Sequence, residues 1–274
     1  MRHILVPTDF SASADNAVAY ARLLASEFSA RIALAHVHPI PQDPLRIGEW
    51  KKESYEEQEA ILEQHAGWLR STGLDVDVIL QFGNAVSRLK RIVHREAIDL
   101  IVMGCQGEHY LSAKFFGSTT TALMDEVNTP ILAVPVGFAP SFPRNPMWAT
   151  DRRPVRSTKT LEPLYQLVDR ATTELRVFHY QEAGENALPD DRFKELLAEV
   201  RHDYFVQLAD GDTVEGAIRK FVRMTGVDLI TVLHRQSSWL SRLITGSYTR
   251  SIVWRTPVPV LILQEVHSFS SVSK

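Results

Sequence analysis

A set of glycine and hydroxyl residues in the middle of the chain has the types and spacing of an anion site. Gly104, Gly107, Gly117 and Ser118 form the pattern Gly-x2-Gly-x9-Gly-Ser directly after the apolar run 98–103. A glycine at the end of a strand can turn through positive φ and leaves room for a ligand to approach the backbone. The first turn of the helix that follows has unpaired N–H groups and a positive dipole end. The pattern predicts phosphate binding, although the same glycines could simply cap a strand and a helix.

Asp9 is the carboxylate best placed for a binding site. It ends the first apolar run, directly after Pro7 and Thr8. At a strand tip it could hydrogen-bond a ribose or an adenine, or help to hold a metal. It could equally cap the helix that is expected to begin near Ala14.

The other chemically active residue types do not form a recognisable catalytic set. His36 and His38 lie two apart on a predicted strand and point to the same face. A metal pair would need further ligands, so packing or strand-end roles are expected and no metal site is assigned. Cys105 lies inside the glycine loop, where it is expected to be exposed or simply a small residue that fits. No Walker loop, Rossmann glycine pattern, nucleophile elbow or catalytic carboxylate pair occurs, so no catalytic residue is predicted.

The strand-tip aspartate and the glycine loop have to be positioned by strands that alternate with helices. The apolar runs predict strands at 3–9, 31–38, 74–82, 98–103 and 131–135, and the helical stretches between them are 14–30, 49–72, 85–96 and 118–127. This alternation is typical of an α/β fold with a parallel sheet. Ligands of such sheets bind at the carboxyl ends of the strands, where Asp9, Val37 and Gly104 can converge on one crevice.

The pattern then restarts after a proline-rich linker at 137–146. Thr150 and Asp151 echo Thr8 and Asp9, the run 227–232 echoes 98–103, and Gly246-Ser247 follows Gly117-Ser118 after a constant 129 residues. This is an internal duplication. It predicts two tandem repeats, at 1–140 and 144–268, each with a five-stranded parallel sheet.

The glycine spacing in its strand–loop–helix context resembles the nucleotide-binding signature of the universal stress protein family, and the Pro7-x-Asp9 strand tip belongs to the same signature. The resemblance covers both repeats and implies two Rossmann-like domains of the adenine-nucleotide alpha-hydrolase type. It implies a cytoplasmic protein that binds ATP, with Mg²⁺, and supports survival under stress. In this family the backbone at Val37 faces the adenine, and the loop glycines hold the phosphates. The ATP-binding residues that it implies are Pro7, Thr8, Asp9, Val37, Gly104, Gln106, Gly107, Gly117, Ser118 and Thr119.

The second repeat has lost the signature. Leu233 and Gln236 stand where the first repeat has Gly104 and Gly107, so ATP is expected in the first domain alone. Four arginines surround this altered loop and form either a contact for an anionic partner or a solvated face; they are Arg235, Arg242, Arg250 and Arg255.

The fifth strand of each repeat predicts how the two domains meet. Residues 131–134 and 260–263 are wholly apolar and carry no charge that would protect an open sheet edge. Pairing of the two strands would make an intramolecular pseudo-dimer, and the resemblance supports this because single-domain members commonly dimerise through this strand. Further homodimerisation is compatible with the same pattern.

Composition limits which binding partners and which cellular location are expected. The net charge of −3 gives no general attraction to nucleic acid or to a membrane surface. One cysteine, and no apolar run near the roughly 20 residues that span a bilayer, predict a cytoplasmic protein. The sequence therefore favours ATP as a regulatory or conformational ligand and not an enzyme. A binding module that works without nucleotide, or a slow ATP-hydrolysing enzyme, remain the alternatives.

Overall fold

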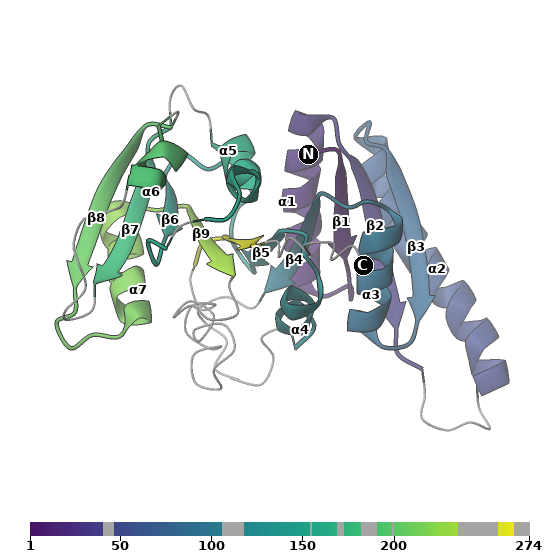
Figure 1. The fold of residues 1–274 in the computed structure, drawn as a ribbon. Coiled ribbons are helices and arrows are strands. Elements are labelled where there is room, and N and C mark those ends of the chain that lie inside the picture. The colour runs from purple at the N-terminus through teal and green to yellow at the C-terminus, as the bar shows by residue number, and fades with distance from the viewer. Residues whose placement is uncertain are drawn as a thin grey trace, which may run out of the picture.

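The computed structural model describes residues 1–40, 47–105, 118–153, 155–168, 173–181, 191–198, 200–234 and 257–265. The elements of the first half are β1 (His3–Pro7), α1 (Ala12–Phe28), β2 (Arg31–His38), α2 (Ile47–Ser71), β3 (Val76–Phe82), α3 (Ala85–Arg95), β4 (Leu100–Cys105), α4 (Ser118–Glu126) and β5 (Ile131–Pro135). Those of the second half are β6 (Pro146–Ala149), η2 (Thr158–Leu161), α5 (Glu162–Leu167), β7 (Leu175–Gln181), α6 (Asp191–Leu196), β8 (His202–Leu208), α7 (Val214–Thr225), β9 (Leu229–His234) and β10 (Val260–Gln264). Figure 1 shows the two halves side by side.

The strands of the described residues form one ten-stranded sheet with the order β3-β2-β1-β4-β5-β10-β9-β6-β7-β8. Neighbouring strands run parallel throughout, except that β5 and β10 pair antiparallel at the centre. In each half the chain moves outward from the first strand and then returns to its other side. The first switch in strand order therefore lies between β1 and β4, where sheets of this kind bind ligands.

Helices cover both faces of this sheet, so most strand residues are buried on either side. One core cluster includes apolar residues of α1, α2, α5 and α6, and the other includes residues of α3, α4 and α7. Both clusters contain residues from each half of the chain. The two repeats therefore share a continuous core.

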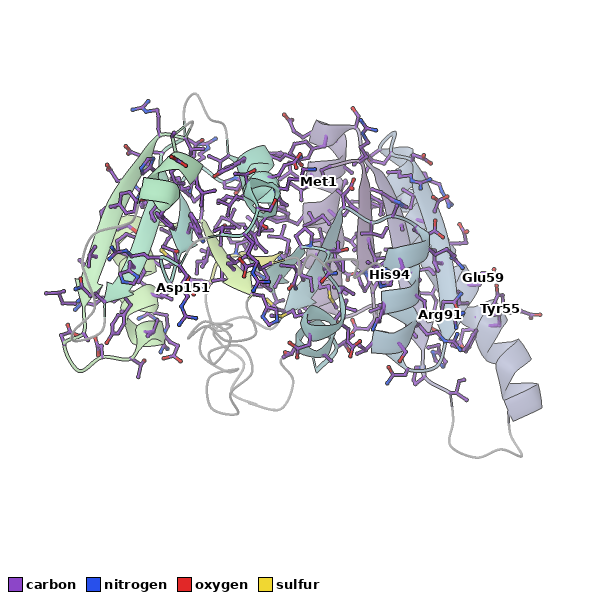
Figure 2. The ribbon with its side chains drawn as sticks, in the orientation of Figure 1. Met1, Tyr55, Glu59, Arg91, His94 and Asp151 are labelled. Carbon is purple, nitrogen blue, oxygen red and sulfur yellow. The ribbon has the colours of Figure 1, made fainter. Side chains whose placement is uncertain are left out.

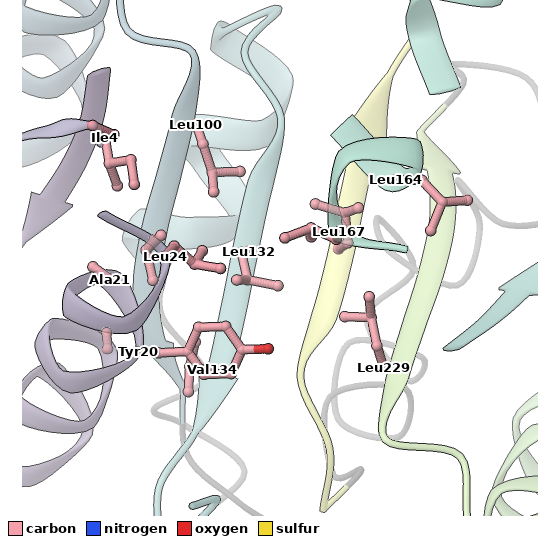
Figure 3. Close-up of a cluster of buried hydrophobic side chains, with 14 of the residues drawn as sticks. Ile4, Tyr20, Ala21, Leu24, Leu100, Leu132, Val134, Leu164, Leu167 and Leu229 are labelled. Carbon is pink, nitrogen blue, oxygen red and sulfur yellow. The ribbon is translucent and has the colours of Figure 1, made fainter. Parts of the chain in front are cut away.

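The seam between the halves is the pairing of β5 with β10, the last strand of each half. Val260 pairs with Ala133, Leu261 with Leu132 and Ile262 with Ile131. Figure 3 shows the apolar side chains on one face of this seam, where those of α1 and β5 face Leu164 and Leu167 of α5. A further contact joins the halves at α5, where the amino group of Met1 (labelled in Figure 2) donates to Gln166 Oε1 at 3.0 Å.

The predicted α/β tandem fold is confirmed, and the first-half elements lie within a few residues of their predicted bounds. Helix α1 starts before Ala14 because Ser11 caps it, with its hydroxyl accepting from the Ala14 N–H at 3.3 Å. Two of the described helices in the second half are short. Its α5 and α6 have six residues each, whereas α1 has 17 and α2 has 25. Among the described helices none is long and apolar enough to span a membrane.

Candidate functional site

A pocket lies at the carboxyl ends of β1, β2 and β4, at the first switch in strand order. Its cavity has a volume of about 160 Å³ and opens to solvent. The first turns of α1, α3 and α4 complete its wall. The described lining residues are Pro7, Thr8, Asp9, Ser13, Ala14, Ala35, Val37, Ala85, Leu89, Met103, Gly104, Thr119 and Thr120.

The tip of β1 forms a tight hydrogen-bonded turn on the polar side of the pocket. The Ser11 N–H and hydroxyl both donate to Asp9 Oδ1, at 3.1 and 2.5 Å. Thr8 Oγ1 accepts from the N–H of Phe10 at 3.0 Å, and Phe10 takes a positive φ of 61°. Ser11 is therefore the cap of α1, and the alternative role of Asp9 as the direct cap is wrong. Asp9 orients the capping serine and remains exposed at the pocket.

Gly104 is required by close packing, for a reason that differs from the one expected. Its φ is not positive, so the expectation that this glycine serves a positive-φ turn is wrong. A Cβ at this position would lie 2.2 Å from the carbonyl oxygen of Ser13 and 2.7 Å from the nitrogen of Ala14. The glycine thus lets the first turn of α1 rest directly on the end of β4, and both segments line the pocket.

Helix α4 begins at the pocket with residues of the predicted glycine–serine segment. Ser118 is its first residue, and Thr119 and Thr120 of the first turn line the pocket. The predicted residues Gln106, Gly107 and Gly117 lie outside the described residues, so their phosphate contacts stay predictions. Helix α4 has nine residues, and its first turn lines the same pocket as Thr8 and Asp9.

Part of the pocket lining is apolar. Ala35 and Val37 point into it from β2, and Ala85 and Leu89 from the start of α3. The sequence reading named only Val37 among these four. The two-residue alternation of β2 would have identified Ala35 as its neighbour on the same face.

The two histidines of β2 make contacts within the fold. His36 is buried, and its Nδ1 donates to the backbone oxygen of Thr8 at 2.7 Å, which ties β2 to the tip of β1. The ring centroid of His38 lies 5.7 Å from that of His36. Burial, together with the neighbouring His36, lowers the pKa of His38. Within the described ranges no three His, Cys, Asp or Glu side chains are grouped closely enough to hold a metal.

Cys105 is buried, so the expectation that its thiol might be exposed is wrong. It ends β4, and its side chain joins the core cluster on the α3 and α4 side of the sheet. Burial raises the pKa of the thiol far above its usual value, which keeps it protonated and unreactive.

The second half repeats the hydrogen bonds at the tip of the first strand. It does not repeat the close contact made by Gly104. Arg152 donates its N–H to Thr150 Oγ1 at 2.9 Å and has a φ of 59°, and His179 donates to the oxygen of Thr150 at 3.0 Å. Asp151, labelled in Figure 2, accepts from the N–H of Arg153 at 3.2 Å. These are the contacts made by Thr8, Asp9 and His36 in the first half.

Leu233 occupies the position of Gly104 and is buried in the same core cluster as Leu161 and Leu164. A leucine side chain fills the place where α1 rests in the first half. The arginines predicted around the altered loop, at 235, 242, 250 and 255, lie outside the described residues.

Comparison with known proteins agrees with the duplicated fold. A universal stress protein of Methanocaldococcus jannaschii is 26% identical over 152 residues, which cover 48% of this chain and 94% of the relative. The crystal structure of a universal stress protein from Archaeoglobus fulgidus covers 96% of this chain and 98% of its own, with a TM-score of 0.75 and 20% identity. The model of the universal stress protein family matches residues 1–135 and again residues 153–264. Both halves match separately and together span most of the sequence, so the chain belongs to the universal stress protein family as a tandem two-domain member.

Proposed function

We propose that the first domain, residues 1–140, binds ATP in the pocket at the ends of β1, β2 and β4, and that ATP acts as a regulatory or conformational ligand. One observation carries the proposal. Six residues implied by the sequence signature come from four separate elements and line a single pocket; they are Pro7, Thr8, Asp9, Val37, Gly104 and Thr119.

The pocket lining offers apolar and polar groups that suit the parts of a nucleotide. Ala35, Val37 and Leu89 offer apolar surface for a flat base. The hydroxyl of Thr8 and the carboxylate of Asp9 can bind ribose hydroxyls. A mostly apolar wall with a few converging polar groups is the usual composition of small-molecule sites.

The phosphates would lie against helix amino termini, because the described lining residues include no lysine, arginine or histidine. The first turns of α1 and α4 both face the pocket, and each presents the positive end of its dipole. Asp9 is the described carboxylate that could hold Mg²⁺ beside the phosphates. The donor set therefore fits ATP with Mg²⁺, and the predicted glycines Gly107 and Gly117 would add backbone contacts.

This chemistry supports binding more strongly than turnover. Fast phosphoryl transfer needs charge neutralisation and a positioned nucleophile, which Walker lysines, metal ions and basic groups supply in NTPases. Asp9 is the one ionisable side chain among the described lining residues, and Ser11 already occupies its Oδ1. Any hydrolysis would accordingly be slow, and we assign no catalytic residue.

A nucleotide-independent binding role suits the second domain, residues 144–268. Leu233 fills the place of the glycine that brings α1 onto β4 in the first domain. The β5–β10 pairing supports an intramolecular pseudo-dimer, in which fusion supplies a high local concentration of the partner domain. Self-association into further homodimers is compatible with this arrangement, and a cytoplasmic role in stress fits the single cysteine.

The proposal is tested by identifying and titrating the nucleotide. Mass spectrometry of the purified protein should find ATP, and calorimetry of nucleotide-free protein should give about one site per chain. Gly117→Val should abolish binding, because a branched side chain would fill the space at the start of α4. Circular dichroism of each variant confirms that the fold is retained.

The duplication offers a matched control. Gly246→Val makes the same change at the corresponding position of the second repeat and should leave ATP affinity unchanged. Two equivalent sites per chain would overturn the assignment to the first domain. Full affinity in a folded Gly117→Val protein would remove the glycine–serine segment from the site.

A further inference from the structure

Helix α4 joins the nucleotide pocket of the first domain to the second domain. Its first turn places Thr119 and Thr120 in the pocket wall. Its last turn meets the ends of β9 and β10, where His234 and Gln264 are the final strand residues. One short helix therefore touches both the proposed ATP site and the other repeat.

The contact with Gln264 satisfies a backbone group of the helix end. Gln264 Nε2 donates to the carbonyl oxygen of Met124 at 3.2 Å, and both side chains are buried. Met124 is among the last four residues of α4, whose carbonyls have no partner inside the helix. Without Gln264 this buried carbonyl would lose its hydrogen bond, which is costly away from water.

The contact with His234 holds the neighbouring side chain of the same turn. His234 Nε2 lies 3.3 Å from Asp125 Oδ1, with the imidazole buried and the carboxylate about half exposed. A helix of nine residues is marginal on its own and depends on such tertiary contacts for its order. The second domain thus supplies two polar contacts to one turn of a helix that the first domain uses at its pocket.

We propose that His234 and Gln264 are positioning residues for the nucleotide pocket: from the second domain they hold the last turn of α4 and so fix its first turn in the pocket wall. The inference rests on the proposed ATP site and adds a dependence of that site on the second repeat. It also implies that ATP bound at α4 strengthens the contact between the domains, because coupling between two sites is reciprocal.

The surroundings of His234 define the protonation state that makes this contact. Asp125 faces it from α4, the adjacent Glu126 is paired with Lys90 of α3, and Glu265 after β10 is paired with Arg156. Nδ1 of His234 is buried and has no hydrogen-bond partner among the described residues. The neutral ring, with its proton on Nε2, therefore satisfies Asp125, whereas a second proton on Nδ1 would be buried without an acceptor.

The protonation of His234 sets the direction of the pH dependence. Burial lowers the pKa of His234 below its usual value, and Asp125 opposes that shift only in part. The solvated ring of the unfolded chain takes up a proton more readily than the buried ring of the folded protein. The stability that the neutral ring contributes through this contact is therefore fully present above about pH 6.5 and is lost as the pH falls through the lowered pKa of the folded state.

Four variants test the inference on the full chain, with ATP titrated from about pH 5.5 to 8. His234→Ala and Gln264→Ala should each weaken ATP binding about three- to tenfold at pH 7.5, the size expected for one lost hydrogen bond. His234→Gln keeps a donor that does not titrate, so it should retain affinity at pH 7.5 and bind more tightly than the wild type at pH 5.5. His202→Gln changes a second-domain histidine that bonds the oxygen of Val200 and should follow the wild type at every pH.

Hydrogen exchange of the α4 amides in nucleotide-free protein measures how firmly His234 and Gln264 hold the helix. Faster exchange at residues 118–126 in His234→Ala and Gln264→Ala, together with weaker ATP binding, would support the inference. Unchanged exchange in both variants would overturn it. Faster exchange with unchanged ATP affinity would also overturn it, because the contact would then be structural only. A wild-type protein that binds no ATP would instead refute the proposed function, and this separates the two failures.

Discussion

Adding a single methyl group at Gly104 tests the close contact between α1 and β4. The Cβ of Gly104→Ala would lie 2.2 Å from the Ser13 oxygen and 2.3 Å from the Ser13 carbonyl carbon. Both atoms belong to the backbone, at a helix start that Ser11 fixes by its cap. No side-chain rotation can relieve this overlap, so α1 has to shift away from the sheet.

The cost can be estimated from the geometry. Overpacking a well-filled core usually costs about 1–3 kcal/mol, and a clash with backbone belongs at the upper end. A loss of about 3 kcal/mol should lower the Tm of a domain of this size by about 6–12 °C. Calorimetry or circular dichroism measures this shift. ATP affinity should fall as well, since Ser13 and Ala14 line the pocket.

Gly67→Ala is the matched control. Gly67 lies inside α2, is exposed, and has no atom within 4 Å of where its Cβ would be. Alanine is about 1 kcal/mol better than glycine inside a helix, so this variant should raise the Tm by about 2–4 °C. If Gly104→Ala unfolds at the wild-type temperature while Gly67→Ala behaves as expected, the packing argument for Gly104 is refuted.

Three further outcomes are expected from the described contacts. Ser11→Ala removes the cap of α1 and should lower the free energy of unfolding by about 1 kcal/mol in urea titrations, whereas an unchanged midpoint would exclude the capping role. Ile262→Asp buries a charge in the β5–β10 seam and should promote aggregation in light scattering; a monodisperse, equally stable variant would contradict this. Cys105 should resist thiol reagents in the folded protein even at about pH 9, because burial raises the pKa of its thiol, and should react only in denaturant. Rapid labelling of the native protein would show that the thiol is accessible.

The sequence predicts the fold well where pattern and local chemistry agree. The second and fifth strands of the first half begin and end as predicted, because each apolar run is bounded by proline or charge. The strand tips also converge as the sequence predicts, because Pro7, Thr8, Asp9, Val37 and Gly104 line one pocket. These successes share one cause: parallel strands bring their carboxyl ends to the same edge of a sheet.

The sequence was less informative where a residue acts through three-dimensional contact. The sequence pattern predicts backbone freedom as the reason for Gly104, but the relevant neighbour is the carbonyl of Ser13, which lies 91 positions away. Cys105 looked like a loop residue because glycines flank it, yet it ends a buried strand. The contact of His234 with Asp125 joins the two repeats, and no local pattern in either repeat indicates it.

The central antiparallel pairing has a consequence for the growing chain on the ribosome. The first repeat is complete when Pro135 has been made, but the strand that pairs with β5 ends at Gln264, 129 residues later. At about 5–20 residues per second, the edge of β5 waits about 6 to 26 seconds for its partner. During that time the backbone N–H and C=O groups on the edge of β5 have no partner strand, and two nascent chains on one messenger can pair through it. Slow translation of the second repeat should therefore increase misassembly, and a chaperone that binds apolar strand edges should reduce it.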